Sequence, residues 1–225
     1  MCGRYSFAPK PKQLEAQLHD VQRPLDLKIS FNIAPTHQAY VVANDDPDRL
    51  QLMQWGLVPS WSPDGKNGGK LINARAEGIE AKPAFRAAVR ARRCLVPADS
   101  FYEWRTEGKR KIPYRISLKN GELLFLAGIW EEWRHGGELK RTFSIVTTEP
   151  NREMTALHNR MPVVLADAEQ QQSWLYSKSL EEALATLRPA GDDSLDLYRV
   201  SEKLNSPAND GPELHEKVPE ELQLF

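Results

Sequence analysis

A cysteine stands directly behind the initiator methionine, in the opening stretch "MCGRYS". Methionine aminopeptidase generally removes the initiator when the second side chain is small, so we expect the mature chain to start at Cys2. That residue would carry an amine and a thiol on adjacent carbons, with reference pKa values of about 7.7–8.0 and about 8.5, so a useful fraction of each is nucleophilic near neutral pH. An internal cysteine lacks this pair. Position alone leaves open whether Cys2 reacts or merely follows the start codon.

A second reactive candidate is Glu103, in the strand-like run "SFYEWR". Its neighbours Tyr102 and Trp104 are aromatic, and a carboxylate among aromatic rings tends to be desolvated, which raises its pKa and suits it to proton transfer at neutral pH. In a strand, Phe101, Glu103 and Arg105 would share one face. Pairing with a cation across the sheet is therefore the alternative role for Glu103.

Two further runs combine polar side chains. In "LINARAE", strand alternation places Asn73, Arg75 and Glu77 on one face, which is either a site or a wet surface. In "ALHNRMPVVL", His158 and Arg160 lie two residues apart in a stretch that the following proline biases towards extended backbone, so they should face one way. A histidine beside an arginine tends to stay neutral and able to give or take a proton.

Metal binding is not expected, because no His, Cys or carboxylate cluster has the spacing of metal ligands. We expect no cofactor either. The remaining histidines lie in helix, turn or tail contexts and receive no role: His19, His37, His135 and His215.

Composition limits the classes of protein. The 225 residues are 40% hydrophobic, carry a net charge of −1 and include two cysteines, which fits a reduced cytosolic protein without a disulfide framework. No apolar run reaches the roughly 18 residues of a membrane helix, and no secretory signal precedes Cys2. The charge argues against nucleic-acid binding through bulk positive charge, although residues 82–93 are locally basic and residues 201–225 are acidic.

The elements that must position these residues are mostly short strands joined by turns. Periodicity and capping residues predict helices at about 12–21, 83–92, 167–176 and 179–187. Strands are predicted at 38–42, 49–58, 71–77, 100–105, 112–118, 122–130, 141–148 and 195–201. We therefore expect one α+β domain spanning residues 1–225. It would have a mostly antiparallel, open barrel-like sheet, short flanking helices and a loose acidic tail from about residue 206.

Nine fragments occur in the order found in the SRAP family, the SOS-response-associated peptidases, and the chain resembles that family from Cys2 to about Asn205. The fragments are "MCGRY", "FNIAPT", "WGLVPSW", "LINARAE", "CLVPADSFYEW", "LAGIWEEW", "SIVTTEPN", "LHNRMPVVL" and "RVSEKLN". The resemblance implies a DNA-repair protein that covalently captures abasic sites in single-stranded DNA. The amine of Cys2 would condense with the sugar aldehyde to an imine, and the thiolate would close a thiazolidine ring. Any residue left before Cys2 would forbid that ring.

The resemblance also implies individual roles. Asn73 resembles the amide that holds the sugar and the N-terminus, Glu103 the carboxylate that moves protons during imine formation, and His158 the residue that promotes opening of the sugar ring. The arginines similar to the family's phosphate-binding residues are Arg4, Arg75 and Arg160.

A base-stacking surface is implied in the same way by Trp55, Trp61 and the "NIAPT" loop with Asn32 and Pro35. Stacking contributes about 1–3 kcal/mol per base. Core packing is the alternative for both tryptophans. Thr147 would hydrogen-bond near the N-terminus, and the glycine-rich run at 60–70 leaves DNA contacts there in doubt.

Two other functions stay open. Cys2 could be the nucleophile of a cysteine peptidase or N-terminal-nucleophile hydrolase, self-cleavage after Met1 being one version. The polar residues could instead form a non-catalytic module that binds single-stranded DNA. We expect single-stranded DNA with abasic sites as the partner, no membrane contact, a monomer, and a cytoplasmic protein that joins the nucleoid when bound to DNA.

Overall fold

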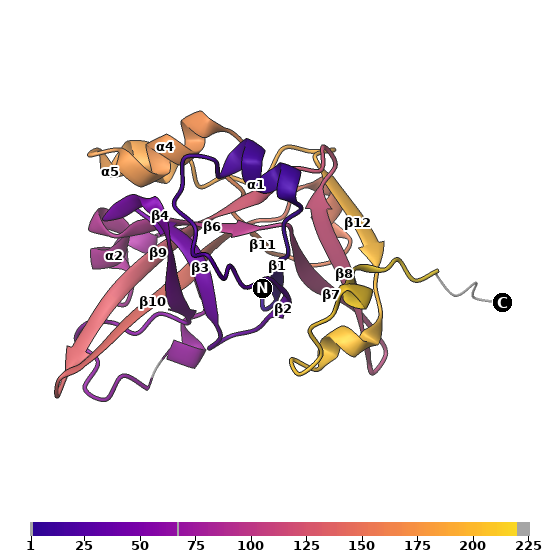
Figure 1. Ribbon diagram of the computed structural model, residues 1–225, viewed down its shortest axis with the longest axis horizontal. Coiled ribbons are helices and arrows are strands. Elements are labelled where there is room, and N and C mark those ends of the chain that lie inside the picture. The colour runs from indigo at the N-terminus through magenta and orange to yellow at the C-terminus, as the bar shows by residue number, and fades with distance from the viewer. Residues whose placement is uncertain (1, 67, 220–225) are drawn as a thin grey trace.

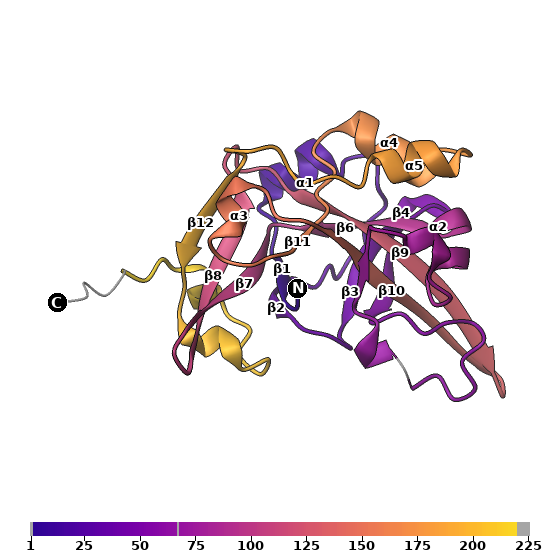
Figure 2. The same ribbon diagram turned by 180° about the vertical axis from the view of Figure 1, so that it is seen from behind.

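Two β-sheets with short helices around them make up the fold in the computed structural model, which describes residues 2–66 and 68–219 (Figure 1). The first sheet is antiparallel throughout, with strand order β12–β8–β7–β1–β2. Its strands are β1 (Tyr5–Phe7), β2 (Ser30–Ile33), β7 (Ser100–Glu107), β8 (Arg110–Leu118) and β12 (Leu195–Arg199). From both sides of the molecule, β1 and β2 lie between the second sheet and the strands β7, β8 and β12 (Figures 1 and 2).

The second sheet closes on itself. Pairing runs β10–β4–β3–β6–β9, and β9 pairs again with β10, so five strands form a barrel. Two pairings are parallel, β10 with β4 and β10 with β5, and the rest are antiparallel. The predicted α+β class with a mostly antiparallel, barrel-like core is confirmed. The strands are β3 (Gln38–Ala43), β4 (Asp46–Trp55), β5 (Asn73–Arg75), β6 (Arg93–Ala98), β9 (Leu124–His135), β10 (Glu138–Thr148) and β11 (Met161–Pro162).

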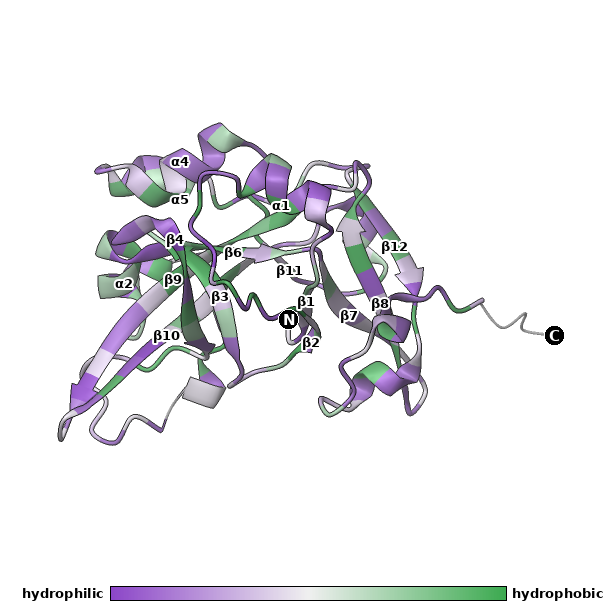
Figure 3. Cartoon of the chain, in the orientation of Figure 1, coloured by the Kyte–Doolittle hydropathy of each residue, from purple (hydrophilic) through white to green (hydrophobic). Residues whose placement is uncertain are grey.

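The helices are short and lie around the sheets. Apolar residues make up much of β3 and β6, whereas the distal end of the β9–β10 hairpin is mostly polar (Figure 3). As the capping residues predict, Asp167 and Ser179 accept the first-turn hydrogen bonds of α4 and α5. The α-helices are α1 (Pro11–Gln17), α2 (Arg86–Ala91), α3 (Arg152–Thr155), α4 (Ala168–Tyr176) and α5 (Leu180–Ala185), and single 3-10 turns occur at Gly68–Lys70, Ile79–Ala81, Glu202–Asn205 and Pro212–His215. Within the described residues, none of the helices is long and apolar enough to cross a membrane.

The chain after residue 206 packs onto the five-stranded sheet, which corrects the expectation of a loose tail as far as residue 219. Leu214 is fully buried in a small apolar cluster with Tyr102. The Asp210 carboxylate accepts hydrogen bonds from the Phe31 amide (2.5 Å) and the Ser30 hydroxyl (3.1 Å). Apolar burial and these bonds to β2 offset the acidic composition that suggested disorder. Residues 220–225 lie outside the described residues.

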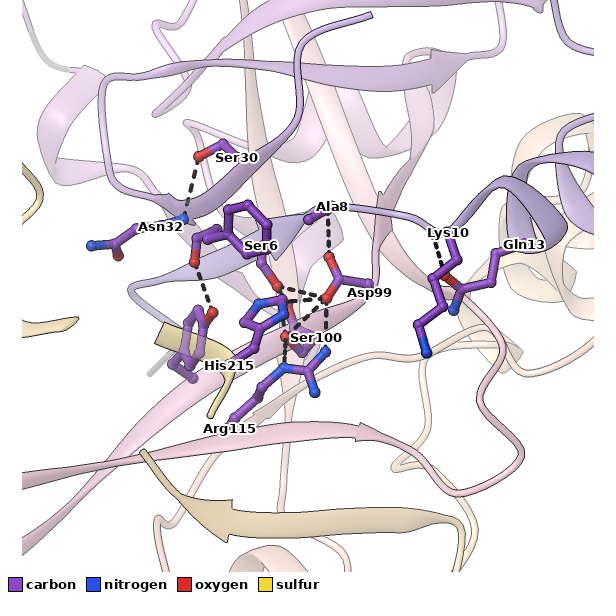
Figure 4. A network of polar contacts seen from close by, with 12 residues as sticks. Ser6, Ala8, Lys10, Gln13, Ser30, Asn32, Asp99, Ser100, Arg115 and His215 are labelled. Carbon is purple, nitrogen blue, oxygen red and sulfur yellow. Dashed lines mark hydrogen bonds and ion pairs between the residues drawn. The ribbon is translucent and has the colours of Figure 1, made fainter. Parts of the chain in front are cut away.

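A buried polar network joins this C-terminal segment to the sheet (Figure 4). The Asp99 carboxylate accepts hydrogen bonds from the Ser6 hydroxyl (3.0 Å), the Ala8 amide (2.6 Å) and the Arg115 guanidinium (2.9 Å). The Nε2 atom of His215 lies 3.7 Å from the same carboxylate. Burial, reinforced by the positive charge of Arg115, outweighs the attraction of Asp99 and lowers the pKa of His215 to about 4. The imidazole is therefore neutral at physiological pH.

Candidate functional site

The start of the chain is held beside Glu103 by the pairing of β1 with β7. Tyr5 pairs with Phe101, and the Tyr102 amide donates to the Arg4 carbonyl at 2.9 Å. Cys2 is 0% exposed and Glu103 is 3% exposed. Burial raises the pKa of both groups, and the negative charge of Glu103 raises that of the Cys2 thiol further. Cys2 is thus a neutral thiol next to a carboxyl group that keeps its proton to a higher pH than an ordinary glutamate.

Asn73 fixes the first peptide from the barrel side. Its strand β5 lies parallel to β10, with Asn73 opposite Ile145. The side-chain amide donates to the Cys2 carbonyl at 2.8 Å, while its Oδ1 atom is buried and accepts no hydrogen bond from the described residues. The predicted alternation is present, because Ala74 is fully buried and Arg75 is exposed. Asn73 therefore holds the carbonyl of Cys2 and has one buried acceptor atom left over.

The ring of His158 contacts the backbone of Arg160, and the Arg160 side chain has other partners. The Arg160 amide lies 3.0 Å and the Arg160 carbonyl 3.2 Å from Nδ1 of His158, so the backbone of Arg160 holds the imidazole in place. The Arg160 guanidinium donates to the Thr147 carbonyl at 2.6 Å and to both carboxylate oxygens of Glu77 at 2.7 and 2.8 Å. Arg75 stands opposite Thr147 in the β5–β10 pairing. These residues form one continuous group on the barrel side of the site.

A cleft of about 570 Å³ opens where the two sides meet. The Arg4 guanidinium lies over the Trp104 ring, 5.9 Å from its centroid, and donates to the Asn32 side chain at 2.6 Å. Three residues that line the cleft were predicted site residues: Arg4, Glu103 and His158. The other three lining residues received no role from the sequence: Trp104, Lys111 and Asn205.

Four predicted DNA-contacting positions lie elsewhere. Trp55 is fully buried, packs edge-on against Tyr5 at 5.1 Å and donates its indole N–H to the Ile72 carbonyl at 2.9 Å. Core packing is therefore the role the structure supports for Trp55, and its ring offers no face to a base. Trp61 is 64% exposed, so core packing is excluded for it. Pro35 is partly buried in a surface loop.

Asn32 is 1% exposed and holds the C-terminal segment by hydrogen bonds. Its side-chain amide donates to the Ser206 carbonyl at 3.0 Å and the Asn209 carbonyl at 2.7 Å, while its oxygen accepts from Arg4. A contact between this buried amide and DNA is therefore not available, and Asn32 acts on the site by holding Arg4.

The three cleft residues without a predicted role stand in sequence contexts that only weakly indicate a site. Trp104 follows Glu103 in an aromatic run, and its indole N–H donates to the Asn205 side chain at 2.7 Å. Asn205 closes the fragment "RVSEKLN", and Lys111 lies at the end of a turn-forming run. Trp104 and Lys111 reach the cleft on β7 and β8, and packing of the 3-10 turn Glu202–Asn205 brings Asn205 there. In the described part of the chain, no group of three or more His, Cys, Asp or Glu side chains is placed to hold a metal ion.

The fold defines a β-barrel protein that buries the start of its own chain between the barrel and the five-stranded sheet. A crystal structure of a protein from Bacteroides thetaiotaomicron has the same fold, with a TM-score of 0.85, 29% identity, and coverage of 97% of this chain and 100% of that chain. The chain belongs to the SRAP family, since residues 1–207 match the family described as SOS response associated peptidase.

Named relatives are similar along most of the chain. It is 41% identical over 223 residues to Abasic site processing protein YoqW of Bacillus subtilis, covering 96% of this chain and 99% of the relative. It is 32% identical over 196 residues to Abasic site processing protein HMCES of Gallus gallus, covering 75% of this chain and 58% of the relative.

Proposed function

We propose that this protein captures abasic sites in single-stranded DNA through a covalent thiazolidine at Cys2, after Met1 has been removed. The observation that carries the proposal is the position of Cys2, which is buried beside the carboxyl of Glu103 and held at its carbonyl by Asn73 at 2.8 Å. Membership of the SRAP family and the names of the relatives supply the substrate class.

The chemistry needs two bonds to one carbon. An abasic sugar equilibrates between a closed hemiacetal and an open aldehyde. The imidazole of His158 is suited to moving a proton as the hemiacetal opens: the anomeric hydroxyl loses one proton while the ring oxygen gains one, so the net change is zero. The Cys2 amine adds to the aldehyde carbon, and the hydroxyl of that adduct leaves as water with a proton from Glu103, which gives a protonated imine. Glu103 is now a carboxylate and accepts the thiol proton. The thiolate then forms the C–S bond and the ring nitrogen becomes neutral, so the sum is condensation with loss of one water.

The environment suits this order of events. Burial raises the pKa of Glu103, which favours the protonated form that the loss of water requires, and burial raises the pKa of the Cys2 thiol, which favours a neutral sulfur before an electrophilic imine is present. The free acceptor Oδ1 of Asn73 can receive a hydrogen bond from the new N-terminal amine or from a sugar hydroxyl.

The DNA would be held by its backbone and by stacking. Arg4, Arg75 and Arg160 surround the site and would contact phosphates, while exposed Trp61 and the loop at Pro35 would stack on neighbouring bases. We further propose that the chain works as a single SRAP-type domain, as a monomer, in the cytoplasm.

The test mixes the purified protein with an oligonucleotide that contains one abasic site and follows the complex on a denaturing gel. We expect an adduct whose intact mass equals the protein without Met1 plus the oligonucleotide minus one water. Cys2→Ser, or an extra residue retained before Cys2, should remove the adduct, and Cys94→Ser should keep it because Cys94 is buried in the core. A normal yield from the blocked chain excludes the thiazolidine. A complex that dissociates on denaturation would favour a non-catalytic module, and peptide cleavage without a DNA adduct would favour a hydrolase.

A further inference from the structure

In the DNA-free protein, the guanidinium of Arg160 is bound to the carboxylate of Glu77. The Nη1 and Nη2 atoms of Arg160 donate to Oε1 and Oε2 of Glu77 at 2.7 and 2.8 Å, a two-pronged geometry. A guanidinium binds two oxygens of a phosphate with the same fork. Glu77 therefore stands where a DNA phosphate would bind.

The two partners are held very differently. The Arg160 side chain is 13% exposed, and the Thr147 carbonyl of β10 accepts a hydrogen bond from its Nη2 atom at 2.6 Å. The Glu77 side chain is 58% exposed and lies in the turn that follows β5. When the pair separates, the arginine thus stays anchored to the barrel and the carboxylate moves into water. Exchange of this partner is possible because the Glu77 carboxylate is more than half exposed and is hydrated when it leaves the arginine.

A second cation lies within electrostatic range of the same carboxylate. The Arg160 hydrogen bond, and more weakly the charge of Arg75, lower the pKa of Glu77. The carboxylate is thus ionised at neutral pH and competes with any anion for this pair of arginines. A small anion that displaces Glu77 gains hydrogen bonds from the guanidinium of one arginine only. A DNA strand has several phosphates and can engage Arg4, Arg75 and Arg160 together.

We propose that Glu77 determines which anions reach Arg160: its carboxylate fills the phosphate position in the DNA-free protein and yields only to a nucleic-acid backbone that makes further contacts. This inference rests on the proposed function, since it takes single-stranded DNA as the incoming anion. Glu77 is a specificity-determining residue and takes no part in the bonds made at Cys2.

The experiment measures reversible binding, separately from capture. Fluorescence anisotropy would follow a labelled single strand with a tetrahydrofuran abasic analogue, which has no aldehyde, binding to Cys2→Ser and to Cys2→Ser/Glu77→Gln protein. We expect about two- to fivefold tighter binding with glutamine at position 77. We also expect inorganic phosphate, compared with chloride at equal ionic strength, to compete better in the Glu77→Gln protein.

Two controls separate this role from a general change of charge. Glu132→Gln removes the same charge from another surface ion pair, on β9, in which Glu132 Oε1 lies 2.7 Å from Arg134 Nη2. It should not tighten binding. In an Arg160→Ala background, Glu77→Gln should bring no gain.

Each contrary result has a distinct meaning. Unchanged or weaker binding by the Glu77→Gln protein, an equal gain from Glu132→Gln, or a gain that survives Arg160→Ala overturns the inference while the proposed function stands. Tighter binding by Glu77→Gln, together with no covalent adduct from protein that retains Cys2, supports the inference and overturns the proposed capture. No binding by any variant overturns both.

Discussion

Replacing Glu103 by glutamine should slow capture and, at the same time, stabilise the folded protein at neutral pH. Burial raises the pKa of this carboxyl above its ordinary 4.5. Such a group holds its proton more tightly in the folded than in the unfolded state, so stability falls as the pH rises from 4.5 through the folded pKa and stays lower above it. Glutamine keeps the shape and cannot ionise. The variant therefore escapes that loss, and the two proteins should converge in stability at acidic pH.

Both effects are large enough to measure. Relief of one unfavourable group commonly stabilises a protein by about 0.5–2 kcal/mol. For a chain of 225 residues each kcal/mol corresponds to about 2–4 °C in Tm. General acid–base assistance contributes about 10²–10⁴-fold to a rate. We expect a protein that melts several degrees higher near neutral pH and forms the adduct at least about a hundredfold more slowly.

Single-turnover capture on denaturing gels and thermal unfolding across pH supply the two readings. Glu131→Gln is the matched control, because Glu131 is 4% exposed but accepts a hydrogen bond from Arg92 at 2.8 Å. Loss of that pair should lower Tm and leave capture unchanged. Wild-type capture by Glu103→Gln would show that the carboxyl does not move protons. A lower Tm for it near neutral pH would refute the argument from burial.

Three further outcomes are expected. His158→Ala should slow capture of a natural abasic site far more than capture of a strand bearing an acyclic aldehyde, and equal slowing would remove its role in opening the sugar. The DNA-binding constant should fall with salt concentration, with a slope of about −2 in a plot of log K against log [salt] if Arg4, Arg75 and Arg160 contact phosphates, and each alanine variant should reduce the size of that slope by about 0.7. Abasic sites in duplex DNA should be captured more slowly than those in single strands. Because the pKa of His215 is lowered from 6.5 to about 4, stability should fall as the pH drops between those values; a His215→Gln variant that shows the same fall in urea titrations would exclude this origin.

Local patterns in the sequence predict much of this fold. The capping residues Asp167 and Ser179 mark real helix starts, and the turn at 43–48 joins two strands of the barrel. Closure of the barrel is different. It depends on parallel pairing of β10 with β4, in which Thr142 lies opposite Gln54, and no local signal records a partner so distant in the chain.

The candidate site divides in the same way. Strand alternation and aromatic neighbours indicate Asn73 and Glu103, because those signals are local. Asn32 and Asn205 owe their positions to the C-terminal segment, whose acidic composition suggested disorder. Trp55 could have been assigned to the core, since Met53, Trp55 and Leu57 alternate with Gln54 and Gly56 in the sequence. All three apolar side chains are fully buried in the structure.

The complete burial of Cys2 has a consequence for the timing of synthesis. Its segment is held by β7, which ends at residue 107, so the start of the chain cannot dock until that strand has left the ribosome. At about 5–20 residues per second, the terminus stays accessible for roughly 5–20 s. We therefore expect an external aminopeptidase to remove Met1 before Cys2 is buried. Unprocessed protein should accept the aminopeptidase when unfolded and resist it once refolded, which intact-mass measurement can follow.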